Sequence, residues 1–448
     1  MKLVLLGGAG FRTPAMYEAV HDVRELLGID ELVLYDVDDA RLPRVLRVLE
    51  GIDRERGSRV AVRATADLDD ALEGADVVYS AIRVGGIQSR IIDETVPLAH
   101  GVLGQETTGP GGIAFALRTI PVMRMIAERT AQRAPRAWFM NFTNPAGMIT
   151  EAIAEVLGDR AFGICDTPRG MFRRIAAALG RPPETLWFDY AGLNHLGYIQ
   201  GVLDGGVDLL PGLLADDDLL ATLEEGDIFD RDFLRSLGMI PNEYLAYYYG
   251  TADVVARQLA AGRTRGQEIA ETQQGYFAVE PETPEAALAA WRAATRARSS
   301  TYMAEAGAVR TDGSRAGAGV DDLEGYAGVA LRAALALRSS QPTVMVLNAR
   351  NRSALPFLPP DAIVETVCVV SGAGVRTIAA APLPLHARGL IEQMKEVEQT
   401  TIAAALQGSA ALAARALALH PLVPSVVVAG RILDAYRAQE PNLRALLA

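Results

Sequence analysis

The sequence predicts an α/β protein with a Rossmann-type, doubly wound parallel sheet and a second α+β domain. In the first half, apolar runs of strand length alternate with helical segments, which is the pattern of βαβ units. The first strand signal, Lys2–Leu6, passes directly into a glycine-rich turn. From about Leu196 onward the apolar periodicity becomes mainly helical. We therefore expect one domain at residues 1–195 and a second, α+β domain at residues 196–448.

Composition and charge narrow the class of protein. Half of the 448 residues are hydrophobic, yet no apolar run reaches the ~18 residues that would span a bilayer. The net charge is −12 and the basic residues are scattered, which argues against nucleic acid as a partner. Two cysteines are too few for a disulfide framework. These features predict a soluble, cytoplasmic protein with ample core and a small-molecule ligand.

The glycine turn after the first strand signal predicts a dinucleotide site. Gly8, Gly10 and Phe11 precede a helical stretch, and bare backbone at a helix N-terminus can approach a pyrophosphate. Thr13 replaces the third glycine of the usual fingerprint. The next strand signal ends in Asp36, where an acid accepts hydrogen bonds from an adenosine ribose and favours NAD over NADP. The alternative for this acid is a helix cap.

Further polar residues follow the other strand signals of the first half. Arg83 and Arg90 come just past the strand signal Asp76–Ile82, where they can bind a phosphate or carboxylate. The glycine-dense loop 104–112 suits a segment that lies over a ligand. Asn144 follows another strand and either caps the next helix or reaches nicotinamide and sugar hydroxyls.

One cysteine and one histidine are candidate metal ligands. Cys165, beside Asp166, and His195, beside Asn194, each end an apolar run of strand length. A thiolate and an imidazole suit a divalent transition metal, and two protein ligands leave coordination positions open for substrate and water. The competing interpretations are a core cysteine and a structural histidine.

The second half is mainly helical with two strand signals. Thr343–Asn348 and Ala362–Val370 are expected to form strands of a second sheet, and Ala387–Leu419 to form long helices that pack between subunits. The charged, alanine-rich segment Glu280–Ala308 is expected to be a solvated, mobile helix.

The ordered motifs of the chain resemble the NAD- and divalent-metal-dependent glycoside hydrolases of family 4, which have a lactate/malate dehydrogenase-type fold. The resemblance covers nearly the whole chain, beginning at the glycine turn that ends in Thr13-Pro14 and at Arg83-Val84-Gly85. The other motifs that carry it are Gly104-Gln105-Glu106-Thr107, Asn141-Phe142-Thr143-Asn144-Pro145-Ala146, Ile164-Cys165-Asp166, Gly192-Leu193-Asn194-His195, Ile240-Pro241-Asn242-Glu243-Tyr244, Val346-Leu347-Asn348, Val364-Glu365 and His420-Pro421-Leu422-Val423.

This resemblance implies an unusual glycosidase mechanism. Bound NAD would oxidise sugar carbon 3, the aglycone would leave by elimination, water would add, and the hydride would return. The resemblance implies that Cys165 and His195 hold Mn²⁺ or a similar ion. It implies that Tyr244 removes the proton on carbon 2, that Asp166 protonates the leaving group, and that the chain forms a homodimer or homotetramer.

The remaining site residues fall into a cofactor group and a substrate group. The cofactor group is Gly8, Gly10, Phe11, Asp36, Arg83, Glu106 and Asn144, and the substrate group is Arg90, Asn144, Asn194 and Arg265. In phosphoglycosidase members of the family that this chain resembles, the first turn contains a serine that this chain lacks. Gly10 stands in its place and Arg12 follows two residues later, so Arg12 is a further candidate for binding an anion.

The substrate and two other functions stay open at this point. Asp166 after the cysteine resembles the α-glycosidase members, whereas the segments 141–147 and 170–171 resemble the 6-phospho-β-glucosidase branch, which we favour. The alternatives are a 6-phospho-α-glucosidase or a glycosidase for an unphosphorylated or other anionic sugar. An NAD-dependent 2-hydroxyacid dehydrogenase would need a histidine acid/base with an acidic partner. An NAD-sensing binding module would leave Cys165, Asp166 and Tyr244 without a function.

Overall fold

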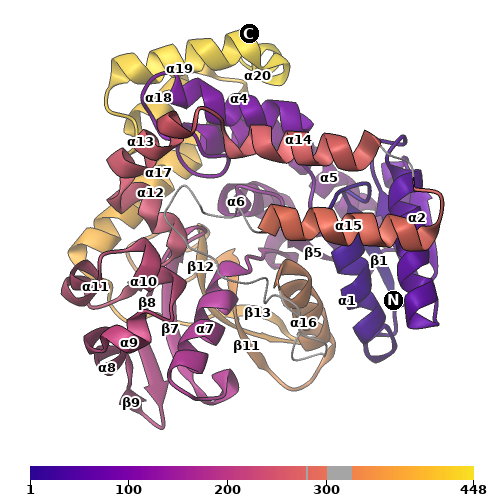
Figure 1. The fold of residues 1–448 in the computed structure, drawn as a ribbon, viewed down its shortest axis with the longest axis horizontal. Coiled ribbons are helices and arrows are strands. Elements are labelled where there is room, and N and C mark those ends of the chain that lie inside the picture. Colours follow the sequence, from indigo (N-terminus) through magenta and orange to yellow (C-terminus); the bar gives the residue numbers. More distant parts are fainter. Residues whose placement is uncertain (279–280, 300–324) are drawn as a thin grey trace.

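The computed structural model describes residues 1–278, 281–299 and 325–448 (Figure 1). Its first half contains six parallel strands in the spatial order β3-β2-β1-β4-β5-β6. Their bounds are β1 (Lys2–Leu6), β2 (Glu31–Tyr35), β3 (Val62–Thr65), β4 (Val77–Ser80), β5 (Trp138–Asn141) and β6 (Ala161–Gly163). Strands β1 to β3 are added toward one edge of the sheet and β4 to β6 toward the other, so the strand order reverses between β1 and β4, where Rossmann-type folds bind dinucleotides. The predicted fold class is confirmed.

The sheet does not stop at β6. It continues through antiparallel strands in the order β11-β12-β7-β8-β10, with β13 on β12 and β9 on β8. Their bounds are β7 (Trp187–Leu193), β8 (Leu196–Asp204), β9 (Val207–Asp208), β10 (Ile240–Pro241), β11 (Thr343–Arg350), β12 (Ile363–Ser371) and β13 (Gly374–Thr377).

The predicted strands at 343–348 and 362–370 are therefore confirmed, but the prediction that they form a second sheet is wrong. They extend the first sheet, since Asn348 of β11 pairs with Gly163 of β6. A Cβ atom at Gly163 would lie 2.8 Å from the Asn348 Cβ, so only glycine permits this approach. The expected domain boundary after His195 falls in the turn between the paired strands β7 and β8. The division of the chain at that residue stays a prediction.

Two hydrophobic cores cover the two faces of the sheet, because alternate strand residues point to opposite sides. Val4 and Leu6 of β1 pack with α5 (Gly109–Arg133), α6 (Ala146–Leu157) and α17 (Leu385–Gln407). Leu3 and Leu5 pack on the other face with α1 (Thr13–Leu27), α2 (Leu42–Arg56) and α16 (Gly325–Arg338). The other α-helices are α3 (Leu68–Leu72), α4 (Gly86–Leu98), α7 (Thr167–Ala178), α8 (Leu210–Ala215), α9 (Asp217–Leu220), α10 (Glu224–Ile228), α11 (Arg231–Leu237), α12 (Ala246–Tyr249), α13 (Thr251–Ala261), α14 (Arg265–Ala278), α15 (Pro284–Ser299), α18 (Ala410–Leu419), α19 (Val426–Gln439) and α20 (Pro441–Leu446).

The predicted helix is confirmed for residues 284–299, as α15, but it is packed on one side rather than solvated, so that part of the prediction is wrong. It lies against α2 (Figure 1), and a Cβ at Gly51 would come within 2.4 Å of the Pro284 carbonyl oxygen. Leu288 and Trp291 are buried at helical spacing, and Trp291 Nε1–H donates to the Phe11 carbonyl at 2.9 Å. Residues 300–308 of the predicted mobile segment lie outside the described residues. Within the described ranges, no helix combines the length and apolar character needed to cross a membrane.

Candidate active site

The glycine turn between β1 and α1 has the geometry of a dinucleotide loop. The backbone N–H groups of Gly7 and Gly8 both donate to the Tyr35 carbonyl at 2.9 Å. A Cβ at Gly8 would lie 2.7 Å from the Leu34 Cβ, so the turn lies directly against β2. Thr13, in place of the third glycine, is buried at the start of α1, and its N–H donates to the Gly10 carbonyl at 3.1 Å. The missing glycine therefore leaves the turn intact.

Asp36 lies beside that turn at the end of β2. Its Oδ2 accepts the Ala9 N–H at 2.8 Å and its Oδ1 accepts the Asp38 N–H at 3.0 Å. The N-cap residue of α2 is Arg41, without a side-chain cap, so Asp36 does not cap that helix. Phe11 continues from the turn and packs edge-on against Tyr276, with 5.6 Å between ring centroids.

Two asparagines at the end of β5 have different surroundings. The Asn141 Nδ2 donates to the Thr143 carbonyl at 3.1 Å and to Thr150 Oγ1 at 3.1 Å, so it holds the loop together. Asn144 Oδ1, by contrast, is buried and has no hydrogen-bond partner among the described residues. A buried acceptor without a donor is rare in folded proteins and indicates a ligand that supplies one. Of the two, Asn144 is the one suited to bind a cofactor or sugar.

Glu106 is the centre of a buried charge network. It forms ion pairs with Arg83 and with Arg90, whose Nη1 lies 2.9 Å from Glu106 Oε1. Arg90 also contacts Glu94, with 2.8 Å between its Nε and Glu94 Oε1. Burial opposes ionisation, but the charges of Arg83 and Arg90 outweigh it and lower the pKa of Glu106 to about 2. The structure therefore brings together three of the predicted site residues.

This network gives a pH-dependent term in stability. Since the folded-state pKa of Glu106 lies below its ordinary value of 4.5, its contribution is full above that pH and is lost as the pH falls toward 2. Between about pH 6 and about pH 3.5, wild type should lose roughly 1 kcal/mol more unfolding free energy than Glu106→Gln. Urea titrations of both proteins at each pH measure this difference. If the unfolding free energies of wild type and Glu106→Gln changed equally with pH, the lowered pKa of Glu106 would be contradicted.

Three further arginines lie near this network, beside its own member Arg90. Arg265 at the start of α14 is placed beside Arg90, since a Cβ at Gly266 would lie 3.3 Å from Arg90 Cγ. Arg12 lies over the rings of Phe142 and Tyr326, at 5.2 and 4.9 Å from their centroids. The third is Arg298 of α15: burial, then the charges of Arg12 and Arg90, lower its pKa. Sequence reasoning missed Arg298, because its segment was expected to be solvated.

Cys165 and His195 follow neighbouring parts of the same sheet. Cys165 is buried just past β6, and burial together with the nearby Glu365 and Asp166 carboxylates raises the pKa of its thiol. His195 is in the β7–β8 turn with a φ of 63°. Burial lowers the pKa of its ring to about 4, although Asp166 and Glu106 oppose this shift. The ring is therefore neutral at pH 7, as a metal ligand must be.

Cys165 and His195 follow strands β6 and β7, which β11 and β12 separate, and the charge of Asp166 reaches both residues. Gly163 is paired with Asn348, Asn348 with Glu365, and Glu365 with Gly192, so one row crosses four adjacent strands. Glu365 lies at the middle of this row and is fully buried. Its Oε1 accepts the side-chain amides of Asn348 at 3.0 Å and Asn194 at 2.9 Å. Glu365 was not predicted as a site residue; the signal was a lone acid in an otherwise apolar strand.

Tyr244 lies against the ring of His195. The two rings are stacked, with 3.7 Å between centroids and 4° between planes. Tyr244 is the middle residue of a short turn of helix, Glu243–Leu245, that is capped by Asn242, whose Oδ1 accepts the Tyr244 N–H at 3.0 Å. The predicted base and one predicted metal ligand are thus in direct contact. A cation bound at His195 would lower the cost of ionising the phenol.

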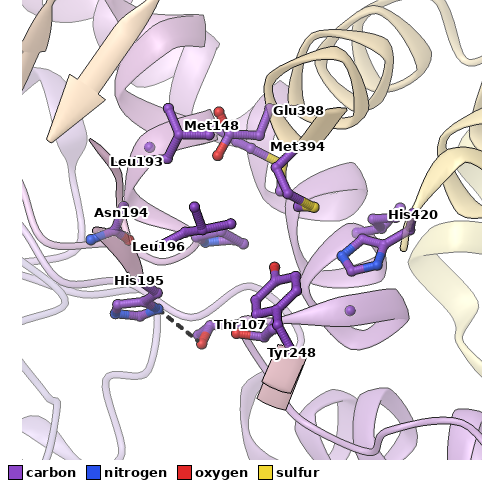
Figure 2. Close-up of a pocket in the computed structure, with 15 residues that line it drawn as sticks. Thr107, Met148, Leu193, Asn194, His195, Leu196, Tyr248, Met394, Glu398 and His420 are labelled. Carbon is purple, nitrogen blue, oxygen red and sulfur yellow. Dashed lines mark hydrogen bonds between the residues drawn. The ribbon is translucent and has the colours of Figure 1, made fainter. Parts of the chain in front are cut away.

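A pocket opens beside His195 (Figure 2). It lies between the N-termini of α5 and α6, the β7–β8 turn and α17. His195 and Thr107 face each other on one side, and Glu398, Met394 and His420 lie on the other. Glu398 pairs with Lys395 at 2.5 Å. Cys165, which does not line this pocket, and His195 offer a thiol and a neutral imidazole, the kinds of donor that a transition metal takes, although the described residues hold no group of three or more His, Cys, Asp or Glu side chains placed to hold a metal ion. The turn at Gly8 and the unpaired Asn144 Oδ1 fit a dinucleotide.

Two family models match this chain. The model described as "Family 4 glycosyl hydrolase" matches residues 2–181, and "Family 4 glycosyl hydrolase C-terminal domain" matches residues 190–423. The chain belongs to glycoside hydrolase family 4. The resemblance drawn from the motifs is confirmed, and the protein is a glycosidase, which leaves the dehydrogenase and sensor alternatives without support.

Relatives within family 4 are similar along nearly the whole chain. A Bacillus subtilis protein named "Probable 6-phospho-beta-glucosidase" is 31% identical, over 97% of this chain and 95% of its own. The 6-phospho-alpha-glucosidase 1 of Lacticaseibacillus paracasei is also 31% identical, over 96% and 95%. A solved structure of the 6-phospho-beta glucosidase from Thermotoga maritima with manganese, NAD+ and glucose-6-phosphate has a TM-score of 0.80 and 27% identity, and covers 98% of this chain and 99% of that chain.

Proposed function

We propose that this family 4 enzyme hydrolyses 6-phospho-β-glucosides with bound NAD and a divalent metal, for which we favour Mn²⁺. The observation that carries the proposal is the stacking of Tyr244 on His195, 3.7 Å between centroids. A phenol with an ordinary pKa near 10 is a useful base at neutral pH only beside a cation. The base must therefore be next to a metal ligand, and Tyr244 is.

The cofactor and metal are assigned to groups of this chain. Gly8, Gly10 and Phe11 would bind the pyrophosphate and Asp36 the adenosine ribose, while Arg83, Glu106 and Asn144 complete the site. Cys165 and His195 would hold the ion. When bound, NAD takes and returns a hydride at sugar carbon 3, and the ion polarises the carbonyl oxygen formed there.

The protein's own residues move the protons. Tyr244 would remove the proton from carbon 2, which becomes acidic once its neighbour is a carbonyl carbon. Asp166 would protonate the glycosidic oxygen as the aglycone leaves, and its charge reaches both Cys165 and His195. Asn194 and Asn144 would bind sugar hydroxyls. Because the Asn194 Nδ2 already donates to Glu365, its Oδ1 is the atom that we assign to the substrate.

The arginines support a phosphorylated sugar. Arg90 and Arg265 would bind the phosphate, with Arg12 in place of the serine that this chain lacks. Guanidinium groups suit phosphate because they donate two parallel hydrogen bonds. Since Glu106 pairs with Arg83 and Arg90, Arg12 is the cation that we expect to matter most.

The β linkage is favoured by the breadth of the motif match and by the β-named relatives. The alternative, a 6-phospho-α-glucosidase, is supported by Asp166 and by relatives that carry the α name at the same identity. Activity on an unphosphorylated or other anionic sugar is the second alternative, because Gly10 and Arg12 depart from the family's first turn.

Nitrophenyl α- and β-glucosides, each with and without a 6-phosphate, separate these possibilities. We expect release of nitrophenol from the β-glucoside 6-phosphate, at least about 10²-fold faster than from its unphosphorylated form because several charge-assisted hydrogen bonds are lost. The rate should fall to background without NAD⁺ or after chelation of metal, with no net accumulation of NADH. Faster cleavage of the α-substrate would transfer the assignment to the α-glucosidases, and cleavage without NAD⁺ would refute the mechanism.

A further inference from the structure

His195 is held at its face and at its edge by protein groups. Its backbone is in the left-handed region, where a residue other than glycine is uncommon. Tyr244 covers one face of the ring. At the ring edge, Thr107 Oγ1 lies 3.3 Å from His195 Nδ1, as the dashed line in Figure 2 shows. These two contacts fix the orientation of the ring.

Gln105 decides which way the Thr107 hydroxyl points. The Gln105 side-chain Oε1 accepts the backbone N–H groups of Thr107 at 2.5 Å and Thr108 at 2.6 Å. Only the oxygen end of an amide can accept two such donors, so the orientation of this amide is settled. The Thr107 hydroxyl lies 3.0 Å from the same oxygen and donates to it.

The proton on His195 follows from this arrangement. A hydroxyl group has one proton, and of the two acceptors within reach of the Thr107 oxygen, Gln105 Oε1 at 3.0 Å is nearer than His195 Nδ1 at 3.3 Å, so the proton is assigned to the bond with Gln105. Toward His195, the Thr107 oxygen can therefore only accept, which requires an N–H at Nδ1. A neutral imidazole carries one N–H, so Nε2 keeps its lone pair.

We propose that Thr107 and Gln105 are positioning residues that fix His195 in its Nδ1–H tautomer and direct the Nε2 lone pair to the metal. Outer partners of this kind orient ligating histidines and strengthen metal binding. The metal in this inference rests on the proposed function, whereas the tautomer is a property of the chain without any ligand. Gln105 and Thr107 lie in residues 104–108 of the predicted loop 104–112, whose last four residues belong instead to α5, which begins at Gly109.

Thr107→Val tests the metal half of the proposal, because it removes the acceptor and keeps the shape. We expect the Mn²⁺ dissociation constant, measured by electron paramagnetic resonance of free Mn²⁺, to rise about 10- to 100-fold. Thr107→Ser keeps the hydroxyl and should bind Mn²⁺ like wild type. The matched control is Thr119→Val in α5, where the buried hydroxyl has no partner within the described ranges; its affinity should not change.

The tautomer is tested separately on the metal-free protein. Nitrogen-15 NMR of histidine-labelled protein distinguishes Nδ1–H from Nε2–H, and with five histidines in the chain a His195→Gln variant assigns the signal. We expect Nδ1–H in wild type and a tautomer mixture in Thr107→Val. An Nε2–H signal in wild type, or unchanged Mn²⁺ affinity in folded Thr107→Val, overturns the inference. Wild type that binds no Mn²⁺ overturns the proposed function instead, so the two failures are distinguishable.

Discussion

Replacement of Cys165 by serine is expected to lower kcat/KM by at least about 10³-fold, because a bound ion contributes several kcal/mol of charge stabilisation in this class of chemistry. Serine keeps the size of the side chain and loses the soft sulfur donor that transition metals prefer. The loss should appear first as weak Mn²⁺ binding, measured by calorimetry. High Mn²⁺ should restore only part of the activity, since a hydroxyl is a poor ligand.

The chain supplies a matched control for this substitution. Cys368 is its other cysteine and is also fully buried, in β12, where its Sγ donates to the Thr366 carbonyl at 3.3 Å. A serine at 368 can make the same hydrogen bond. Cys368→Ser should therefore keep both Mn²⁺ affinity and turnover. If Cys165→Ser folds and keeps wild-type Mn²⁺ affinity, then Cys165 is a core residue and not a ligand.

The Rossmann-type half could be predicted because its signals are local. Each parallel strand is a short apolar run, and its turn residues, such as Gly8 and Asp36, follow it directly in sequence. Parallel strands also end at the same edge of a sheet, so residues after successive strands were expected to meet. Glu106, Arg83 and Arg90 do meet there, in one ion-pair network.

What sequence could not predict depends on pairing between distant strands. The sheet continues past β6 because Gly163 admits Asn348, which lies 185 residues later in the chain (348 − 163). No local pattern encodes that contact. Glu365 appeared in a family motif, but its place in the site was not predicted, since its partners Tyr190 and Asn194 come from another strand and turn. Arg298 was overlooked because a charged, alanine-rich helix looks solvated until its partner helix is known.

Tyr244→Phe is expected to reduce kcat by about 10² to 10⁴-fold, the usual contribution of a general base. Phenylalanine keeps the ring that stacks on His195, so the Mn²⁺ and NAD⁺ dissociation constants should stay within about twofold of wild type, since no hydrogen bond to either ligand is removed. This split between chemistry and binding separates a base from a residue that merely packs against the metal site. It also distinguishes Tyr244 from Cys165, whose loss should weaken metal binding.

Isotope exchange identifies the step that Tyr244 performs. In deuterated water, wild type should place deuterium at carbon 2 of the released sugar, and Tyr244→Phe should do so much more slowly. The control is Tyr249→Phe: that tyrosine is more exposed, and its hydroxyl contacts the Tyr198 hydroxyl at 2.7 Å. Tyr249→Phe should leave turnover unchanged. Equal deuterium incorporation by Tyr244→Phe and wild type would show that another group removes the proton. Asp166 is near enough to His195 for its charge to oppose the lowering of the ring's pKa by burial. Asp166 would therefore be the next residue to test.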